Sequence, residues 1–376
     1  MRETKIVSIV PYKILPAKLG GEKGIALFNE YVGERIPITA IGTRNNDPKY
    51  AKNYKLLNLL SNTRIRYANI FLYFKMRRLI KQKQATHLII EHPYYGWLAW
   101  LLRKTMHIRL VVHSHNIEFE RSRSIGRWWW KALKWYEQWV YQFADIVFFI
   151  SEEDRQNAIS NLGIAENKSF AITYGVEIEG LPADRAQCKA AIQNLHAIDK
   201  DEKILLFNGA LYLHSNYKAL QAILDIINPV LMEQSIPYKI IVCGRGLPDF
   251  FNNLEDYKNK NIIYAGFVDD ITMYFKAADV FLNPILTGGG VKTKAIEAIA
   301  YNNIVISTQS GALGLPVEIC GHKLKIAADD NWDLFTKHTL EAMQESTTTP
   351  RIFYDYYYWG NIAKKVAAIL ELEISP

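Results

Sequence analysis

The residues best suited to chemistry lie in one stretch of the chain, between Asp279 and Pro316. Three consecutive glycines there are followed by two lysines and a glutamate: Gly288, Gly289, Gly290, Lys292, Lys294 and Glu297. Glycines let a backbone approach a ligand closely, because they lack a Cβ atom. The lysines add positive charge where a helix is expected to begin, and the unpaired N–H groups of a helix N-terminus also attract anions. The stretch therefore predicts a phosphate-binding site.

Glu297 follows one turn further along the expected helix. Its carboxylate could accept hydrogen bonds from a pair of sugar hydroxyls, so pyrophosphate at the helix start and ribose beside Glu297 would together describe a nucleotide sugar. A plain loop followed by a solvated helix face is the alternative. The pattern is not a Walker loop, because no Gly-Lys-Ser/Thr follows, and it lacks the G-x-G-x-x-G spacing of a dinucleotide fingerprint.

The elements that position these residues alternate between strands and helices. A strand is expected at Val280–Leu282, a helix from Val291, and another strand at Ile304–Ser307. Further strands are expected at 5–11, 36–42, 87–91, 109–113, 145–151, 203–208, 238–242 and 262–264. This alternation predicts parallel sheets of the α/β class, and the pattern restarts near residue 203, which indicates a second domain. In such sheets ligands bind beyond the carboxyl ends of the strands.

The segment Gly-Gly-Gly-Val-Lys-Thr-Lys-Ala-Ile-Glu-Ala-Ile-Ala, followed by a strand and Ser-Gly-Ala-Leu-Gly-Leu, resembles the donor-binding signature of family four retaining glycosyltransferases. The resemblance implies the GT-B architecture, an α/β fold with two Rossmann-like doubly wound domains facing a cleft. It implies an acceptor-side domain at residues 1–180, joined by a C-terminal helix at about 353–376. A donor-binding domain is expected at residues 181–352.

The resemblance also implies roles for single residues. Lys294 matches the family's phosphate-binding lysine, Lys292 is expected to support it, and Glu297 matches the second of two family glutamates. Gly289 stands where the first glutamate is usual, which puts contacts to the donor sugar, as opposed to its nucleotide, in question. The other implied donor-binding positions are Gly209, Gly244, Phe267, Val268, Gly288 and Gly290. Gly20 and Gly21, after the first expected strand, correspond to a loop near the acceptor or the donor phosphates.

Polar segments end two of the expected strands, at 91–96 and 113–118. A histidine at such an edge could hydrogen-bond a sugar hydroxyl or a phosphate, or carry a proton near neutral pH, although each could simply cap a strand end. His115, in His-Asn-Ile-Glu, resembles the place where many family members have a functional histidine near the transferred sugar. It is therefore expected to be catalytic, together with Lys294 and Glu297.

Length and composition fit a two-domain protein of 376 residues, of which 49% are hydrophobic. Three widely spaced cysteines suggest a reducing compartment, with no disulfide framework and no zinc-type spacing. The charged N-terminus lacks the apolar region of a signal peptide, and no apolar run is long enough for a membrane span. These features predict a cytoplasmic protein.

Positive charge is concentrated in the first half of the chain. Residues 1–180 hold 27 lysines and arginines against 16 acidic residues, whereas the rest holds 18 against 22. Within 121–143, five cations alternate with tryptophans, of which Trp128, Trp135 and Trp139 are expected near one helical face. Such a helix suits either an anionic membrane interface or packing on a sheet, and 75–83 forms a second basic helix. No nucleic-acid module is present, so nucleic acid explains the basic half less well than a peripheral position at the inner face of the cell membrane does, and packing on a sheet stays open.

We therefore expect a metal-independent, retaining glycosyltransferase of hexosyltransferase type, active in surface polysaccharide biosynthesis. Its substrates would be a nucleotide-diphosphate sugar and a glycan or polyprenyl-linked acceptor, and no cofactor is implied. Two other classes remain open from the sequence. A GT-B protein that binds sugar nucleotides without catalysis is possible because Gly289 replaces a family glutamate. A nicotinamide-dependent oxidoreductase is the other alternative, and the absence of the dinucleotide fingerprint counts against it.

Overall fold

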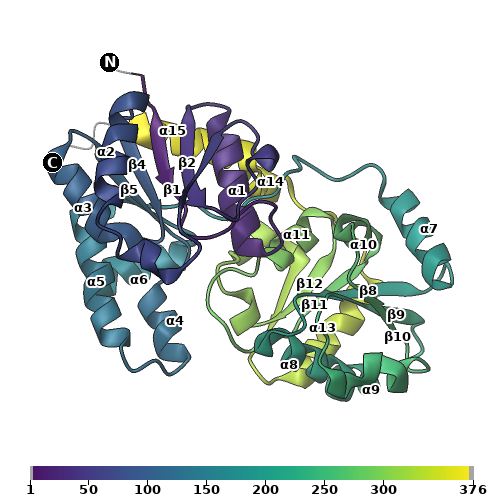
Figure 1. The fold of residues 1–376 in the computed structure, drawn as a ribbon. Coiled ribbons are helices and arrows are strands. Elements are labelled where there is room, and N and C mark those ends of the chain that lie inside the picture. Colours follow the sequence, from purple (N-terminus) through teal and green to yellow (C-terminus); the bar gives the residue numbers. More distant parts are fainter. Residues whose placement is uncertain (1–2, 372–376) are drawn as a thin grey trace. The chain divides into compact units, whose positions relative to one another are not determined.

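The computed structural model describes residues 3–371, and the chain divides into two compact units. Unit 1 comprises Met1–Glu177 with Tyr357–Pro376, and unit 2 comprises Ile178–Tyr356. Each unit has one parallel β-sheet covered by helices (Figure 1). The fold is therefore α/β, with two doubly wound units. All three cysteines are free and buried.

The sheet of unit 1 has seven strands in the order β3-β2-β1-β4-β5-β6-β7. All neighbouring strands are parallel. The strands are β1 (Ile6–Ile9), β2 (Ile38–Thr43), β3 (Lys55–Leu60), β4 (His87–Glu91), β5 (Arg109–Ser114), β6 (Ile146–Phe149) and β7 (Ser169–Ala171). The central strands are apolar and buried, because both faces of the sheet are covered.

The helices of unit 1 form two layers (Figure 1). One layer packs on the apolar side chains of β1, β4 and β5 and contains α2 (Leu72–Lys83), α3 (Gly96–Thr105) and α5 (Trp130–Phe143). On the other face α1 (Gly20–Gly33) lies against the last helix, α15 (Trp359–Glu371). The remaining α-helices of this unit are α4 (Glu118–Ser124) and α6 (Glu152–Leu162).

The sheet of unit 2 has six parallel strands in the order β10-β9-β8-β11-β12-β13. They are β8 (Lys203–Asn208), β9 (Tyr238–Cys243), β10 (Ile262–Gly266), β11 (Val280–Asn283), β12 (Ile304–Thr308) and β13 (Leu324–Ala327). The α-helices of unit 2 are α7 (Arg185–His196), α8 (His214–Ala222), α9 (Asn228–Met232), α10 (Ile271–Ala277), α11 (Thr293–Ala300), α12 (Val317–Cys320), α13 (Trp332–Gln344) and α14 (Arg351–Tyr357). The last residue of α14, Tyr357, belongs to unit 1.

Two expectations from the sequence need correction. Helix α11 begins at Thr293 and not at Val291, so Lys292 is its N-cap residue. Helix α5 begins at Trp130, so Trp128 lies outside it, and Trp139 packs against Trp100 and Phe143 instead of sharing an exposed face with Trp135. None of the helices described for residues 3–371 combines the length and hydrophobicity that a bilayer crossing requires.

Candidate functional site

The Lys294 side chain lies at the point of the unit 2 sheet where the strand order reverses. β8 and β11 are neighbours there, and the chain continues from them toward opposite edges of the sheet. From the first turn of α11, Lys294 Nζ donates to the carbonyl oxygen of Asn208 at 2.6 Å and to Asn216 Oδ1 at 3.3 Å. This ammonium group is therefore fixed beyond the carboxyl ends of the strands, where ligands of doubly wound sheets bind.

The glycines beside Lys294 stand at positions where a side chain would collide with neighbouring atoms. A Cβ atom at Gly209 would lie 2.8 Å from Lys294 Nζ and 2.9 Å from Asn216 Nδ2. Gly244, with φ 149°, lies so close to Gly209 that a Cβ atom there would collide with the Gly209 carbonyl oxygen. Two expected donor-binding glycines thus line one crowded corner beside the lysine.

Asn216 is a residue of this corner that the sequence analysis did not single out. Its Nδ2 donates to the carbonyl oxygen of Ala210 at 2.9 Å, and its Oδ1 accepts from Lys294. The side chain therefore joins the loop after β8 to the start of α11. The signal in the sequence is the segment from Gly209 to Asn216, which resembles the Gly-Ser-x-x-x-x-Pro-Asn form of some family members and ends on this asparagine.

Lys292 folds back onto the glycine triplet. Its Nζ donates to the carbonyl oxygens of Gly288 at 2.8 Å and Gly290 at 3.0 Å, with Gly289 at 3.4 Å. Gly288 and Gly290 have positive φ angles of 103° and 75°, a conformation that glycine adopts without strain. Because α11 starts only after Lys292, the side chain of this lysine is not held on the helix surface and contacts the glycine triplet instead.

Burial lowers the pKa of both lysines. It brings the pKa of Lys292 to about 8. For Lys294 burial is again the main cause, the neighbouring charge of Lys292 adds to it, and the attraction of Glu297 opposes it, so that its pKa is also about 8. A buried ammonium group of this kind gains much from a bound anion, since the anion supplies the charge partner that solvent does not.

The other expected donor-binding residues lie elsewhere around the same sheet edge. Glu297 is half-buried in α11. Phe267 follows β10 with 68% of its surface exposed, and Val268 is half-buried beside it. Gly289 is exposed and contributes no carboxylate. An exposed ring after β10 can stack on a nucleobase, and the donor-binding role of Phe267 stays a prediction.

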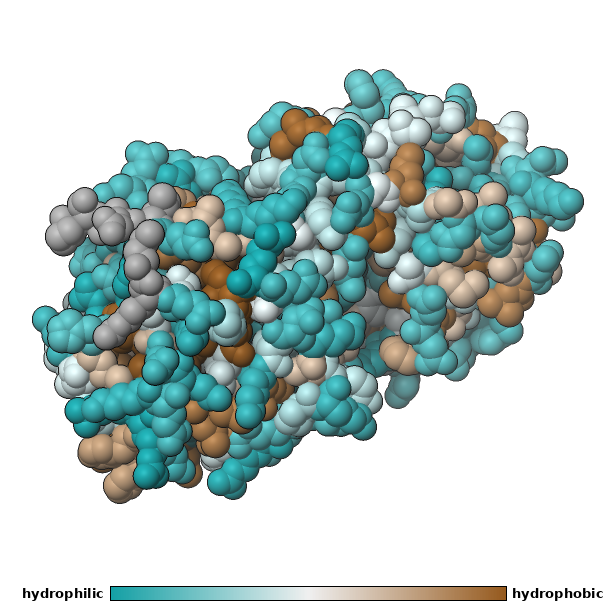
Figure 2. Space-filling model, turned by 90° about the horizontal axis from the view of Figure 1, so that it is seen from above, coloured by the Kyte–Doolittle hydropathy of each residue, from teal (hydrophilic) through white to brown (hydrophobic). Residues whose placement is uncertain are grey.

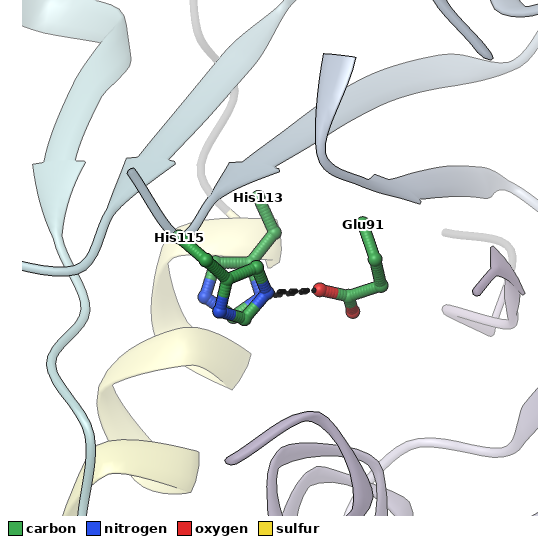
Figure 3. A group of neighbouring side chains, drawn as sticks. All are labelled: Glu91, His113 and His115. Carbon is green, nitrogen blue, oxygen red and sulfur yellow. Dashed lines mark hydrogen bonds and ion pairs between the residues drawn. The ribbon is translucent and has the colours of Figure 1, made fainter. Parts of the chain in front are cut away.

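The remaining expected residues, Gly20, Gly21 and His115, belong to unit 1. Gly20 and Gly21 lie in the first turn of α1, so they belong to a helix start and not to a loop. His115 follows β5, and its Nε2 lies 2.7 Å from Glu91 Oε2 at the end of β4 (Figure 3). Nδ1 of His113 lies 3.0 Å from the same carboxylate oxygen.

Burial and neighbouring charges set the protonation states of Glu91 and His115. Burial alone would raise the pKa of Glu91. His113 and His115 lower this pKa by more than burial raises it, so the carboxyl group is ionised. Burial and the neighbouring His113 lower the pKa of His115, which favours the neutral imidazole. A neutral His115 that donates Nε2–H to Glu91 presents Nδ1 as a hydrogen-bond acceptor.

The same three side chains have the types and spacing that could hold a divalent cation. Their ligating atoms lie within 4.8 Å of one another, and Glu91 Oε1 is buried without a hydrogen-bond partner. The 2.7 Å separation between His115 and Glu91 is that of a charge-assisted hydrogen bond, which explains the pair without an ion.

Two family models match the chain. The model described as "Glycosyl transferases group 1" matches residues 202–345, and the model described as "Glycosyltransferase Family 4" matches residues 30–179. The chain is also 27% identical over 142 residues to an uncharacterized 44.6 kDa protein in the cps region of Klebsiella pneumoniae. That match spans 36% of this chain and 36% of the relative.

Three solved structures show the same fold over nearly the whole chain. Sucrose-phosphate synthase from Thermosynechococcus elongatus has a TM-score of 0.73 at 14% identity and covers 98% of both chains. HepE from Anabaena, in complex with UDP, has a TM-score of 0.73 at 12% identity, covering 98% of this chain and 99% of that one. The lipopolysaccharide outer core galactosyltransferase WaaB has a TM-score of 0.67 at 14% identity, covering 97% and 99%.

Proposed function

Because this chain is a glycosyltransferase of family 4 with the GT-B fold, we propose that it moves a hexosyl group from a nucleotide-diphosphate sugar to a glycan or polyprenyl-linked acceptor. The anomeric configuration is retained, and neither a metal ion nor a cofactor takes part. The family membership decides against the nicotinamide-dependent oxidoreductase that the sequence left open.

The position of Lys294 at the switch point of the unit 2 sheet carries this proposal. When the bond between the sugar and the pyrophosphate loosens, negative charge builds on the leaving group. A preorganised cation stabilises that charge most in the transition state, where the charge is greatest. Lys294, Lys292 and the N-terminus of α11 together supply positive charge at one place, which is the task that a metal ion has in other transferases.

The choice of donor and acceptor rests on similar proteins. HepE is described in complex with UDP, so a UDP-sugar is the first donor to test. WaaB is described as a galactosyltransferase of the lipopolysaccharide outer core, and the Klebsiella pneumoniae relative is encoded in a cps region. These descriptions favour a cell-surface polysaccharide, or its lipid-linked precursor, as the acceptor.

The surface of unit 1 suits an acceptor that is anchored in a membrane. On the face seen in Figure 2, small hydrophobic groups lie among hydrophilic residues. Within the described part of unit 1, most exposed large hydrophobic side chains lie in two segments, one around the α4–α5 connection and one around the start of α2: Ile125, Trp128, Trp129, Trp135, Ile65, Ile70, Phe71 and Phe74. Trp128 alone has 88% of its surface exposed.

The two segments are joined through the start of α3. Trp97 Nε1 donates to the Tyr67 carbonyl oxygen at 2.8 Å, and the Trp97 backbone N–H donates to the Tyr136 hydroxyl at 3.2 Å. Cations lie among the exposed rings, for example Arg127 over the Trp129 ring at 5.1 Å. Tryptophan and phenylalanine beside arginine and lysine favour the interface of an anionic bilayer. Peripheral binding there would bring unit 1 to a polyprenyl-linked acceptor.

Thermal unfolding in the presence of UDP, ADP, GDP and their sugar derivatives tests the donor part of the proposal. A ligand that binds the folded state raises the unfolding temperature by mass action. We expect one nucleoside diphosphate and its sugar to stabilise the protein, and NMR of the released or transferred sugar to show the anomeric configuration of the donor. No stabilisation by any nucleotide would reject the proposal, and an inverted product would reject retention.

A further inference from the structure

A second polar group lies at the switch point of the unit 1 sheet, beside the pair of Glu91 and His115, since the His92 and His115 ring centroids are 4.8 Å apart. β1 and β4 are neighbours in the sheet, and the strand order reverses between them. Tyr12 follows β1 and His92 follows β4, and the Tyr12 hydroxyl lies 2.9 Å from His92 Nε2. In doubly wound sheets the loops diverge at this point and leave the crevice in which ligands bind.

His92 has a backbone conformation that is almost restricted to glycine. Its φ is 68° and its ψ is 156°, and such a conformation strains a residue other than glycine. The backbone N–H of His92 donates to the His113 carbonyl oxygen at 2.8 Å, and the ring stacks on Tyr94 with 5.1 Å between centroids. The surrounding structure therefore holds the imidazole in one orientation despite the strain.

Glu118 contacts the other side of the same imidazole. Its Oε1 lies 3.3 Å from His92 Nδ1, and both side chains are almost fully buried. Burial alone would raise the pKa of Glu118. His92 and Arg121 lower this pKa by more than burial raises it, which favours the carboxylate. Glu118 is the first residue of α4, and its backbone N–H donates to Glu137 Oε1 at 2.9 Å. The backbone that carries the Glu118 carboxylate is therefore held in place.

The charge of Glu118 favours one direction for the hydrogen bond between Tyr12 and His92. Glu118 Oε1 lies 3.3 Å from His92 Nδ1 without forming a hydrogen bond to it, and its negative charge favours the neutral tautomer with the proton on Nδ1. In that tautomer His92 Nε2 is an acceptor. The Tyr12 hydroxyl then donates its proton to Nε2, and its oxygen keeps lone pairs to accept a hydrogen bond from another molecule. Tyr12 is half-buried, and a Cβ atom at Gly21 would approach its oxygen no closer than 3.9 Å.

We propose that Tyr12 is the residue of unit 1 that binds a hydroxyl group of the sugar acceptor, and that His92 and Glu118 position it. The inference rests on the proposed function, because unit 2 provides the phosphate-binding corner and unit 1 has this polar group left for the second substrate. A hydroxyl of a hexose can donate to the Tyr12 oxygen, whereas a phosphate or carboxylate has no proton to donate. The site therefore favours a hydrogen-bond donor such as a sugar hydroxyl over an ionised phosphate or carboxylate.

The test compares Tyr12→Phe with wild type, with Tyr257→Phe as the matched control. Tyr257 lies in unit 2, where its hydroxyl donates to Asp225 at 2.9 Å. The probes are UDP for binding and the octyl glycosides of glucose, galactose and mannose as acceptors, with saturating UDP-sugar. We expect Tyr12→Phe to lower kcat/KM for the acceptor roughly tenfold, the effect of losing one hydrogen bond, while the Kd for UDP stays unchanged. The control should match wild type in both.

Two further variants separate positioning from folding. Glycine adopts this backbone conformation without strain, so His92→Gly should fold and still lose the bond to Tyr12. Glu118→Gln keeps the shape of the side chain, and both variants should raise the acceptor KM while the donor KM is unchanged. An unchanged acceptor kcat/KM in Tyr12→Phe, or an equal loss for donor and acceptor, would overturn the proposal.

The outcome for the wild type separates this inference from the proposed function. If the protein binds UDP and transfers sugar to none of the glycosides, the assignment of Tyr12 is rejected while the donor site stands. If the protein binds no nucleotide at all, it is the proposed function that fails.

Discussion

Lys294 Nζ donates a 2.6 Å hydrogen bond to the carbonyl oxygen of Asn208, which lies 86 residues earlier in the chain. The bond joins the first turn of α11 to the carboxyl end of β8. A second bond, to Asn216 Oδ1, fixes the ammonium group from another side. Because an ammonium group has three donors, one N–H remains for a phosphate oxygen.

Replacing Glu297 with alanine should weaken nucleotide binding. A hydrogen bond to a charged group contributes about 1.5–3 kcal/mol, so the Kd for UDP should rise by at least about tenfold. Isothermal titration calorimetry measures this, with Glu233→Ala, an exposed glutamate at the end of α9, as the control. Equal Kd values for Glu297→Ala and wild type would show that the ribose is not held by this carboxylate.

Nucleotide binding should weaken as the pH rises above about 8. Free Lys292 and Lys294 have pKa values of about 8 because they are buried, and bound pyrophosphate raises those values by favouring the charged form. Below pH 8 both ammonium groups are already charged, so affinity is flat. Above it, binding must take up protons, and affinity falls by up to about tenfold per pH unit for each lysine involved.

The pH dependence has a control in Lys294→Arg. A guanidinium group stays charged throughout this range, so the decline above pH 8 should become shallower even if the affinity at pH 7 is lower. Calorimetry at several pH values between 7 and 10 measures both proteins. A wild-type affinity that is constant from pH 7 to 10 would contradict the assignment of these lysines to the pyrophosphate.

Removal of metal ions should leave sugar transfer unchanged. The positive charge at the leaving group comes from the two lysines and the N-terminus of α11, so excess EDTA has nothing to remove there. The assay is transfer before and after chelation, with added Mg²⁺ and Mn²⁺ as controls. A loss that either ion restores would contradict metal independence and would direct attention to Glu91, His113 and His115.

Unit 1 should bind anionic vesicles, and salt should weaken that binding. Screening reduces the attraction between surface cations and lipid headgroups, while the exposed aromatic rings contribute a part that salt does not remove. Sedimentation with phosphatidylglycerol vesicles at low and high salt measures both parts. The double variant Trp128→Ser with Trp135→Ser should pellet less than the control Phe250→Ser, whose ring is exposed on unit 2. Absence of wild-type pelleting at low salt would reject the membrane surface.

The fold class could be predicted from the sequence because the buried central strands are continuous apolar runs. β4 and β8 have the bounds that the sequence predicts. β3, β7 and β13 were not predicted, and all three lie at sheet edges. β3 is only partly buried and contains Lys55 and Asn58, while β7 and β13 have three and four residues. Edge strands carry a weaker apolar pattern because one side lacks a neighbouring strand.

The candidate site could be predicted only where spacing along the chain determines it. Lys292, Lys294 and Glu297 lie close in sequence, so a strand, a glycine turn and a helix suffice to place them. The contact between Tyr12 and His92 spans 80 residues and depends on a positive φ angle at His92. Neither the contact nor the backbone angle leaves a signature in residue type, since histidine gives no indication of the glycine-like conformation that it adopts here.

The most direct test of the account is single-turnover sugar transfer by Lys294→Ala with saturating donor. Loss of one preorganised charge-stabilising group should lower the rate by about two to three powers of ten. Lys292→Ala should lower the rate less, because its Nζ is held by the glycine carbonyls, and Lys218→Ala, on the exposed surface of α8, should match wild type. An unchanged rate for Lys294→Ala would show that the pyrophosphate is held elsewhere, and the stretch from Asp279 to Pro316 would then be a structural turn.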